Sequence, residues 1–373
     1  MKIAYRLAQK ATPWIPRFVR DRVRMHIQIT DYDLERRKNR NPYSGIEEEM
    51  FKDCSIRLGI IEEVSQSHKY YITACKEMQI SYFIIDILAD DWVERVNSVN
   101  CDAFLAWPSS CSTINKGIYD NRLYILEQDL EQRVFPSWKE CWLTEHKPRL
   151  RDWMLANKIP HPKTWVAYRK ADAMELSRKI KFPLVAKSAT GASGKGVTII
   201  QRPNELQAYI GRIFGKGLSL RGFDPFDKHR GYVFFQKYLP NIEEWRMVRI
   251  GDSYFGHRKG TSSRGLHSGA SFCHWEDPGI ENMNFIKRIT DTHNFRSMDL
   301  DIFVTESGSI LVNELQTTFG CSIATTQMKI DGIEGRYINV DGAWQFEPGS
   351  FCQNHMCNLR VEHLVNALGI NRC

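Results

Sequence analysis

Apolar and polar positions follow a regular order along the chain from residue 55 onward. Apolar runs of strand length alternate with stretches of helical spacing, which predicts strands at 56–62, 80–87 and 103–106 and helices at 68–78 and 92–99. Strands that alternate with helices pair in parallel through right-handed crossovers. We therefore expect a small open α/β domain, whose ligands lie beyond the carboxyl ends of its strands.

The segment that leaves the third of these strands, 107–114 (WPSSCSTI), is mostly small and polar. This position makes it a candidate substrate loop, although a capped turn into the next helix explains the same residues equally well. Helical stretches follow on either side of 147–148, and a boundary falls at Pro160 and Pro162, because two prolines spaced by one residue cannot continue a helix. Beyond it the pattern predicts a strand at 164–168, a helix at 171–179 and strands at 183–187 and 197–200.

A glycine-rich segment joins the last two of these strands, and 187–197 reads KSATGASGKGV. Its glycines let the backbone turn sharply and direct several N–H groups at phosphate oxygens. The segment matches neither the Walker signature nor the dinucleotide fingerprint, because β-branched residues follow it instead of a helix. This favours a hairpin lid over a nucleotide, with a plain glycine hairpin as the alternative. Lys187 favours the lid, since its ammonium would reach the same phosphates.

A second hairpin is predicted in 299–320, where two apolar strands flank the turn at 306–309. Glu314 and Gln316 share one face of the second strand, and pairing about the turn brings Asp301 opposite them. Oxygen ligands that converge in this way suit Mg²⁺, which takes the rest of its coordination from water and phosphates. An exposed polar face is the alternative, but charges that interrupt apolar strands are costly to bury unless they coordinate something.

Taken together, these stretches resemble the ATP-grasp superfamily of ATP-dependent ligases over residues 140–322. The order of the motifs is the family's: Lys147 before the prolines, Lys187 before a glycine lid, a hinge strand at 234–239, an arginine strand at 244–251 and the metal hairpin. The acid-x-Arg pattern of the arginine strand is similar to that of ribosomal-protein glutamate ligases. The register of the metal hairpin and its closing residues, 317–320 (TTFG), are similar to those of D-alanine:D-alanine ligases.

The resemblance implies an α/β (α+β) fold in which two lobes clasp ATP beside a small parallel N-terminal domain. It divides the chain into a basic arm (1–45), the N-terminal α/β domain (46–140), a lid lobe with the glycine loop (141–233) and a C-terminal lobe with the metal hairpin (234–373). The hinge is expected to receive adenine, and Glu243 or Glu244 the ribose. The implied ATP-binding residues are Lys147, Lys187, Gly191, Ser193, Gly194, Gly196, Gln236, Lys237, Tyr238, Leu239, Glu243 and Glu244.

One or two Mg²⁺ ions, or Mn²⁺ in their place, are implied on Asp301, Glu314 and Gln316. Three residues depart from the family pattern: Gln316 replaces the usual Asn, Phe319 replaces a Pro, and Asp299 stands where the dipeptide ligases carry a catalytic Arg. The anion-stabilising role is therefore expected of Arg246, Arg258 or Arg264. The glycine-rich basic segment 256–271 fits a loop that closes over an acyl phosphate, and a solvated surface loop is the alternative.

The implied reaction joins a carboxylate to an amine through an acyl phosphate, with ATP converted to ADP and phosphate. The acid is expected to be an amino acid, a peptide or a sugar acid, since all of these suit an arginine-lined carboxylate site. A kinase of the same fold and a non-catalytic nucleotide-binding protein are the alternatives. No nucleic-acid partner is expected, because the region with the motifs lacks a basic stripe with interleaved aromatic residues.

The net charge of +7 lies entirely in residues 1–40, which hold eleven basic and four acidic residues. This arm is expected to pack on the N-terminal domain or on a second subunit of a homodimer, and contact with an anionic membrane or an acidic partner is the alternative. No apolar run approaches the roughly 18 to 20 residues that span a membrane. Ten cysteines without a repeating spacing suit a reducing compartment, so a cytoplasmic location is expected.

Overall fold

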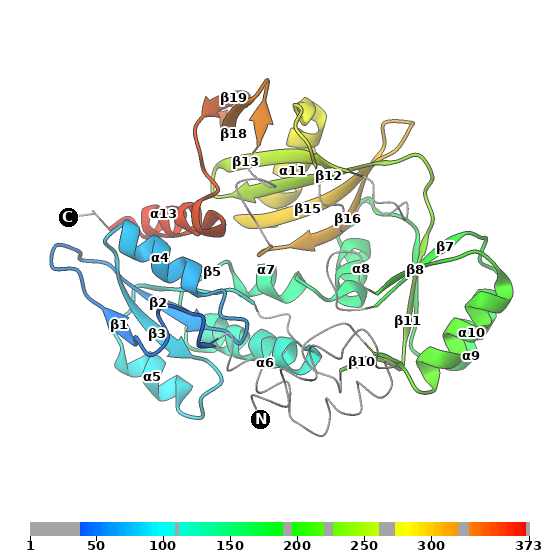
Figure 1. Cartoon of the computed structure of the whole chain (residues 1–373), viewed down its shortest axis with the longest axis horizontal. Coiled ribbons are helices and arrows are strands. Elements are labelled where there is room, and N and C mark those ends of the chain that lie inside the picture. Colours follow the sequence, from blue (N-terminus) through cyan, green and yellow to red (C-terminus); the bar gives the residue numbers. More distant parts are fainter. Residues whose placement is uncertain are drawn as a thin grey trace, which may run out of the picture.

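The computed structural model describes residues 38–108, 112–188, 196–219, 227–260, 273–319 and 328–370. It confirms the predicted α/β class, because parallel and antiparallel sheets and covering helices share the chain (Figure 1). Nearly all of the basic arm lies outside the described residues. Among the helices that the structure describes, none is both long and apolar enough to cross a bilayer.

The first sheet has five strands in the order β1 (Glu48–Glu49), β3 (Ser81–Asp86), β2 (Arg57–Glu62), β4 (Ala103–Leu105) and β5 (Val134–Phe135). Only β1 is antiparallel to its neighbour, so the predicted parallel sheet is confirmed. Helices α4 (Lys69–Glu77) and α5 (Trp92–Ser98) connect its strands at the predicted places. Ser112 caps α6 (Thr113–Tyr124) by accepting a bond from the N–H of Asn115, and a π-helical turn, Ile125–Asp129, continues that helix.

Two short helices, α7 (Trp138–Leu143) and α8 (Lys147–Ala156), lead to the second sheet, with Pro148 in the first turn of α8. This antiparallel sheet has the order β6 (Thr164–Ala167), β11 (Val233–Lys237), β7 (Leu184–Lys187) and β8 (Val197–Ile200). The N–H of Ser188 bonds the carbonyl of Gly196 and closes β7 onto β8, which confirms the predicted strand, loop and strand. Helices α9 (Lys170–Ser177) and α10 (Pro203–Phe214) pack on it, and β9 (Leu218–Ser219) pairs with β10 (Lys228–His229) beside it.

The third sheet has eight strands, and a central path runs β16 (Ile310–Gln316), β15 (Ser297–Val304), β12 (Glu243–Ile250), β13 (Ser253–Lys259), β18 (Ile333–Val340) and β17 (Lys329–Ile330). Strand β14 (Cys273–His274) pairs with β13, and β19 (Ala343–Pro348) pairs with β18. Helix α11 (Gly279–Thr292) buries Met283 and Ile286 in the same core as Met247 and Leu300 of the sheet. Because side chains alternate along a strand, the residues between these core positions face the other side.

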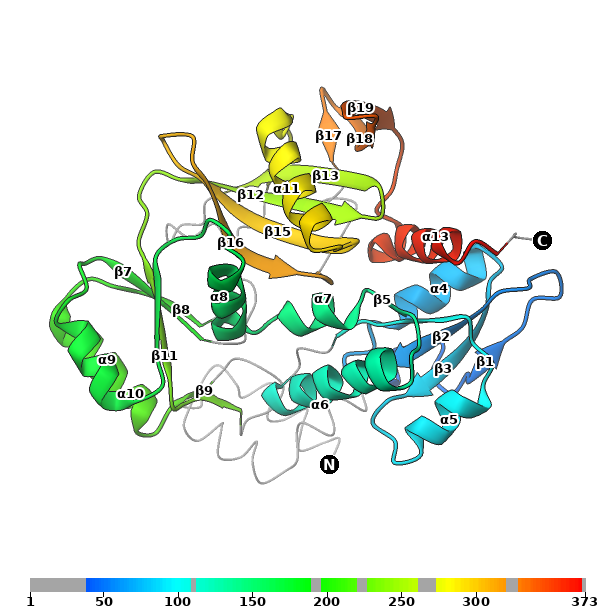
Figure 2. The same cartoon turned by 180° about the vertical axis from the view of Figure 1, so that it is seen from behind.

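The end of the chain returns to the five-stranded sheet. A 3₁₀ turn, Gln353–Met356, leads into α13 (Cys357–Leu368), which lies along α4 in both views (Figures 1 and 2). Val361 and Leu364 of α13 belong to the same buried cluster as Leu58 and Tyr82 of that sheet. The residues of α13 fall within 234–373, the range expected to form the C-terminal lobe, and their apolar face completes the core of the five-stranded sheet.

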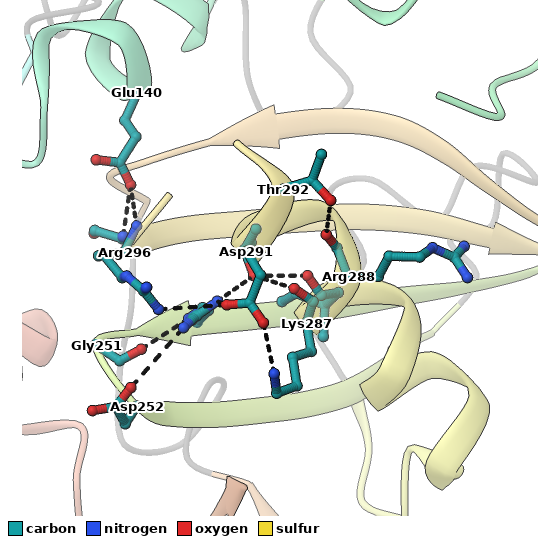
Figure 3. A network of polar contacts seen from close by, with 12 residues as sticks. Glu140, Gly251, Asp252, Lys287, Arg288, Asp291, Thr292 and Arg296 are labelled. Atoms are coloured by element: carbon teal, nitrogen blue, oxygen red, sulfur yellow. Dashed lines mark hydrogen bonds and ion pairs between the residues drawn. The ribbon is translucent and has the colours of Figure 1, made fainter. Parts of the chain in front are cut away.

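A buried carboxylate joins α7 to the eight-stranded sheet (Figure 3). Oε1 of Glu140 accepts the N–H groups of Arg296 and Ser297 at 2.8 and 2.7 Å, and Oε2 accepts the N–H and the hydroxyl of Ser137, both at 2.8 Å. In the same view Lys287 donates to the carboxylate of Asp291 at 2.6 Å. Arg249 also pairs with Asp291, at 2.5 Å. Glu140 is 1% exposed, so its four bonds replace water completely.

We expect Glu140→Ala to lower the free energy of unfolding by about 3 to 5 kcal/mol, because two backbone N–H groups of β15 would be buried without an acceptor. Ser137→Ala is the matched control: it removes the helix cap and the hydroxyl bond to Glu140, leaves both bonds to Arg296 and Ser297 in place, and should cost about 1 kcal/mol. Urea unfolding followed by circular dichroism measures both. Equal losses in the two variants would show that the bonds to β15 contribute little.

Candidate active site

Charged side chains occupy the face of the eight-stranded sheet that lies opposite Met247 and Leu300. The ladder places Glu314 directly opposite Asp301 and Gln316 opposite Asp299, which confirms the predicted pairing of the hairpin. On the other side of β15, Arg246 lies opposite Asp301. Four neighbouring strands therefore present polar groups to one region. Along each strand the side chains alternate between this polar face and the apolar core on the other face.

Asp301 is the centre of these contacts. Arg246 donates from Nε to Oδ1 at 3.1 Å and from Nη2 to Oδ2 at 3.3 Å, a two-pronged arrangement that suits a guanidinium and a carboxylate. The ammonium of Lys259 also pairs with Oδ2, and it lies 2.8 Å from Oε1 of Glu244. Asp301 is 4% exposed, so these cations supply what water would otherwise provide.

Asp299 lies two residues before Asp301 on the same face and is 1% exposed. Nε of Arg246 is 3.1 Å from its Oδ2, but neither oxygen makes a hydrogen bond to any residue that the structure describes. Burial raises the pKa of Asp299 to about 8, with Arg246 acting in the opposite direction. Asp301 has the reverse balance: Arg246 and Lys259 outweigh burial and hold the pKa of its carboxyl below the usual value.

Two lysines reach this face from other parts of the fold. Lys147, at the start of α8, places Nζ 3.0 Å from Oε1 of Glu314. Lys187, the last residue of β7 in the four-stranded sheet, donates to Oδ1 of Asn313 at 2.7 Å. A β-bulge after Asp301 leaves Asn313 without a partner in the ladder. The β15–β16 hairpin therefore meets β7 through Lys187 and α8 through Lys147.

These lysines have different electrostatic environments. Burial opposes the charge on Lys147, but the carboxylates of Glu314, Glu145 and Asp301 together outweigh burial and raise the pKa of Lys147. Burial dominates at Lys187 and lowers its pKa to about 8, although Glu314 acts in the opposite direction. We refer below to Lys147, Lys187, Arg246, Lys259, Glu244, Asp299, Asp301 and Glu314 as the charged cluster. It contains four basic side chains and four carboxyl groups.

The oxygen set fits a hard divalent cation. Asp301 and Glu314 are adjacent across the ladder, Gln316 lies beside them, and the oxygens of Asp299 have no hydrogen-bond donor among the described residues. Mg²⁺ prefers such carboxylate and carbonyl oxygens, with phosphates and water as further ligands. Lys147, Lys259 and Arg246 now contact these carboxylates, so they occupy the side from which a cation would approach.

The hinge residues lie where two sheets join. Gln236 is buried in β11, and Lys237 ends that strand with its N–H bonded to the carbonyl of Lys163. Tyr238 and Leu239 lie between β11 and β12 and are partly exposed. Of the two acids predicted for the ribose, Glu244 is buried and bound to Lys259, whereas Glu243 is exposed and accepts from Trp245.

The remaining predicted site residues lie away from the charged cluster or outside the described residues. Gly196 has φ +83, and a Cβ there would lie 2.1 Å from Oγ of Ser188, so this turn requires glycine. Arg258 projects from the opposite face of β13 to Arg246 and pairs with Glu276, so the structure does not bring it to the charged cluster. Gly191, Ser193, Gly194 and Arg264 lie outside the described residues, as does much of 256–271.

The structure adds residues that the sequence analysis did not assign. Lys259 takes the place expected of Arg258, and the tight turn at 251–252, which sets the register of β12 on β13, could have indicated it. Asp299 follows from strand alternation once Asp301 is placed. The contact between Asn313 and Lys187 depends on the β-bulge after Asp301, and the sequence carries no signal for that bulge. His257, opposite Arg246, is buried, and burial together with Arg246 lowers its pKa to about 3, so its ring is neutral.

Known proteins resemble parts of this chain in sequence or in fold. No family model matches the chain. The alpha-aminoadipate–LysW ligase LysX of Saccharolobus solfataricus is 25% identical over 184 residues, which cover 47% of this chain and 60% of that relative. The chain therefore spans less than two thirds of the length of the relative that it matches.

Solved structures resemble a larger part of the chain. The ADP complex of purK, an N5-carboxyaminoimidazole ribonucleotide synthetase, matches with a TM-score of 0.53 and 13% identity over 79% of this chain and 83% of that one. The D-alanine–D-alanine ligase from Bacillus anthracis matches with a TM-score of 0.50 and 16% identity over 84% and 99%. At such identities the similarity is one of fold.

We expect Asp301→Asn to lower the free energy of unfolding by about 3 to 5 kcal/mol in the absence of nucleotide and metal, because Arg246 and Lys259 would share one buried charge fewer. Asp299→Asn is the matched control on the same strand. It should change stability by about 1 kcal/mol or less, since Asp299 makes no hydrogen bond. Urea unfolding with EDTA measures both, and an equally large loss in Asp299→Asn would contradict this assignment of partners.

Proposed function

The chain has the ATP-grasp fold, and on this premise we propose that it is an ATP-dependent carboxylate–amine ligase. The observation that carries the proposal is the meeting of Lys147 and Lys187 with the hairpin that holds Asp301 and Glu314. A lysine at the end of the lid strand and paired carboxylates on the facing sheet can hold the two ends of a triphosphate. The relative LysX is named as a ligase that joins alpha-aminoadipate to LysW, which supports the same reaction class.

In the proposed reaction a substrate carboxylate oxygen attacks the γ-phosphorus of ATP, and the bond to the leaving ADP oxygen breaks. The amine nitrogen then attacks the acyl carbon, inorganic phosphate leaves, and the amine loses a proton. Positioning and neutralisation of charge are the main tasks of a protein in phosphoryl transfer. Lys147 and Lys187 would move from Glu314 and Asn313 to the phosphates, because these oxygens carry more negative charge than their present partners.

Asp301, Glu314 and Gln316 would hold Mg²⁺, which supplies charge neutralisation for the phosphate oxygens when it is bound. With Asp301 engaged by Mg²⁺, Arg246 and Lys259, which now pair with it, would neutralise the charge that develops on the transferred group. Arg246 keeps its orientation through Asp299, which lies 3.1 Å from its Nε. The backbone of 237–239 would receive adenine, and Glu244 the ribose hydroxyls.

The acid substrate is proposed to be an amino acid, a peptide or a sugar acid, and the amine a second small molecule or a protein group. Such a substrate would bind beyond the carboxyl ends of β2, β3 and β4, which is the general position of ligands on open α/β sheets. A kinase would need one acceptor for ADP release, whereas a ligase needs an acid and an amine together. A phosphate-release screen over paired acids and amines distinguishes the two.

We expect Lys187→Ala and Glu314→Ala each to reduce ADP formation by at least about a hundredfold, because each removes a charge that the transferring phosphate requires. Lys179→Ala is the control: it removes an exposed lysine near the lid strands, which pairs with Glu175 at 2.6 Å. It should retain normal turnover. Normal ADP formation in either site variant, with a native circular dichroism spectrum, would refute the proposed function.

The affinity for ADP should weaken above pH 8, by as much as about tenfold per pH unit, because the pKa of Lys187 lies at about 8 in the free protein. Phosphates favour the charged ammonium, so binding above this pH must take up a proton, and that uptake becomes more costly as the pH rises. Lys187→Arg stays charged and should show a flatter profile between pH 8 and 9.5. Calorimetric titration with ADP tests this, and parallel profiles would contradict it.

A further inference from the structure

Phe319 is a buried aromatic residue that lies shortly after the end of β16. It belongs to a buried apolar cluster that also contains Val248 and Phe255. Cζ of Arg246 lies 5.6 Å from the centroid of its ring, and Cζ of Arg360 lies at the same distance. The π-electrons of a ring attract a guanidinium within about 6 Å of its centroid. The ring therefore contacts one cation of the charged cluster and one cation outside it.

Arg360 gives this ring a fixed neighbour. Its side chain is completely buried. Nε donates to Oγ of Ser297 at 2.9 Å, and the two Nη atoms donate to the carbonyl oxygens of His355 at 2.9 Å and Thr317 at 3.3 Å. These bonds tie α13 to the ends of β15 and β16. Phe319 therefore packs against a guanidinium that is itself held in place.

Arg246 needs a partner that remains when ligands enter the site. It now bonds Asp301, which is one of the residues proposed to hold Mg²⁺. A carboxylate uses the N–H donors of a guanidinium, whereas an aromatic ring attracts the cation without using a donor. Phe319 can therefore hold Arg246 and leave its N–H groups available to phosphate oxygens.

We propose that Phe319 positions Arg246 for the transferred phosphoryl group through a cation–π contact. The proposal rests on the proposed function, in which Arg246 neutralises charge on that group. Phe319 stands where the ATP-grasp pattern has a Pro, whose ring has no π-electrons, so a proline could not make this contact. Phe319 acts through Arg246, which makes it a positioning residue and not a catalytic one.

Calorimetric titration of the full chain tests the proposal with ADP alone and with ADP, Mg²⁺ and aluminium fluoride, which imitates the phosphoryl group during transfer. Phe319→Leu should weaken binding of the aluminium fluoride complex by about five- to thirtyfold, as expected for the loss of a buried cation–π contact. Its affinity for ADP alone should not change measurably. Phe319→Tyr keeps the ring and should restore the affinity for the aluminium fluoride complex.

The matched control is Phe255→Leu. Phe255 is buried in the same apolar cluster and pairs with the ring of Phe351, and among the described residues no cation lies over it. Both leucine variants should lower the midpoint of urea unfolding to a similar extent, but only Phe319→Leu should lose affinity for the aluminium fluoride complex. Phe319→Met fills the same space with a flexible apolar chain and repeats the test if the leucine variant does not fold.

A nuclear magnetic resonance measurement tests the contact without any ligand. The Nε–H of Arg246 is bonded to Asp301, and its signal can be assigned by its loss in Arg246→Lys. Phe319→Leu should shift this signal because the ring current is removed, whereas Phe255→Leu should leave it in place. An unmoved signal in Phe319→Leu, or equal losses of affinity in the two leucine variants, overturns the proposal. Failure of the wild-type chain to bind ADP would instead refute the proposed function, and the Arg246 signal still decides whether Phe319 positions this side chain.

Discussion

The burial of opposite charges on one face of the eight-stranded sheet is the constraint on which the rest of the structure depends. Charges are removed from water at low cost only when each has a partner with good geometry. Asp301 pairs with Arg246 and Lys259, and Glu314 pairs with Lys147. These ion pairs form only if β12, β13, β15 and β16 all keep their present register. A shift of one residue in any strand would turn these side chains into the apolar core.

The same constraint joins parts that are distant along the chain. Lys187 reaches the metal hairpin from the four-stranded sheet, and Lys147 reaches it from α8. Glu140 holds α7 against the backbone at the start of β15, which places α8 next to the hairpin. Helix α13 then covers the core of the five-stranded sheet. The site is therefore built between sheets that are tied to one another by buried polar contacts and by a shared helix.

The start of α8 serves two surfaces. Lys147 points to Glu314, while His146 and Arg149, on either side of it along the chain, line a cavity beside α6. Arg149 bonds Asp120 on α6, so one helical turn connects the charged cluster to a contact between the five-stranded sheet and the segment before β11.

Local patterns predicted a large part of this architecture. The strands and helices of the five-stranded sheet follow from apolar spacing, and the pairing of Asp301 with Glu314 follows from the turn near Gly308, because a short turn leaves few registers. The sequence of 187–197 likewise predicted a lysine directly before a glycine-rich hairpin. These features depend on residues that are near one another in sequence, so the chain specifies them without reference to distant contacts.

The sequence by itself determined the α/β class, the two hairpins and the carboxylate pair, because alternation and turn chemistry act over a few residues. Only the tertiary structure decided that Lys259 and not Arg258 joins the cluster, that a bulge presents Asn313 to Lys187, and that α13 packs on the first sheet. It also brought Thr113 to Asp227 across 114 positions of sequence. Such contacts depend on strand register and on the packing of distant elements, which no local pattern records.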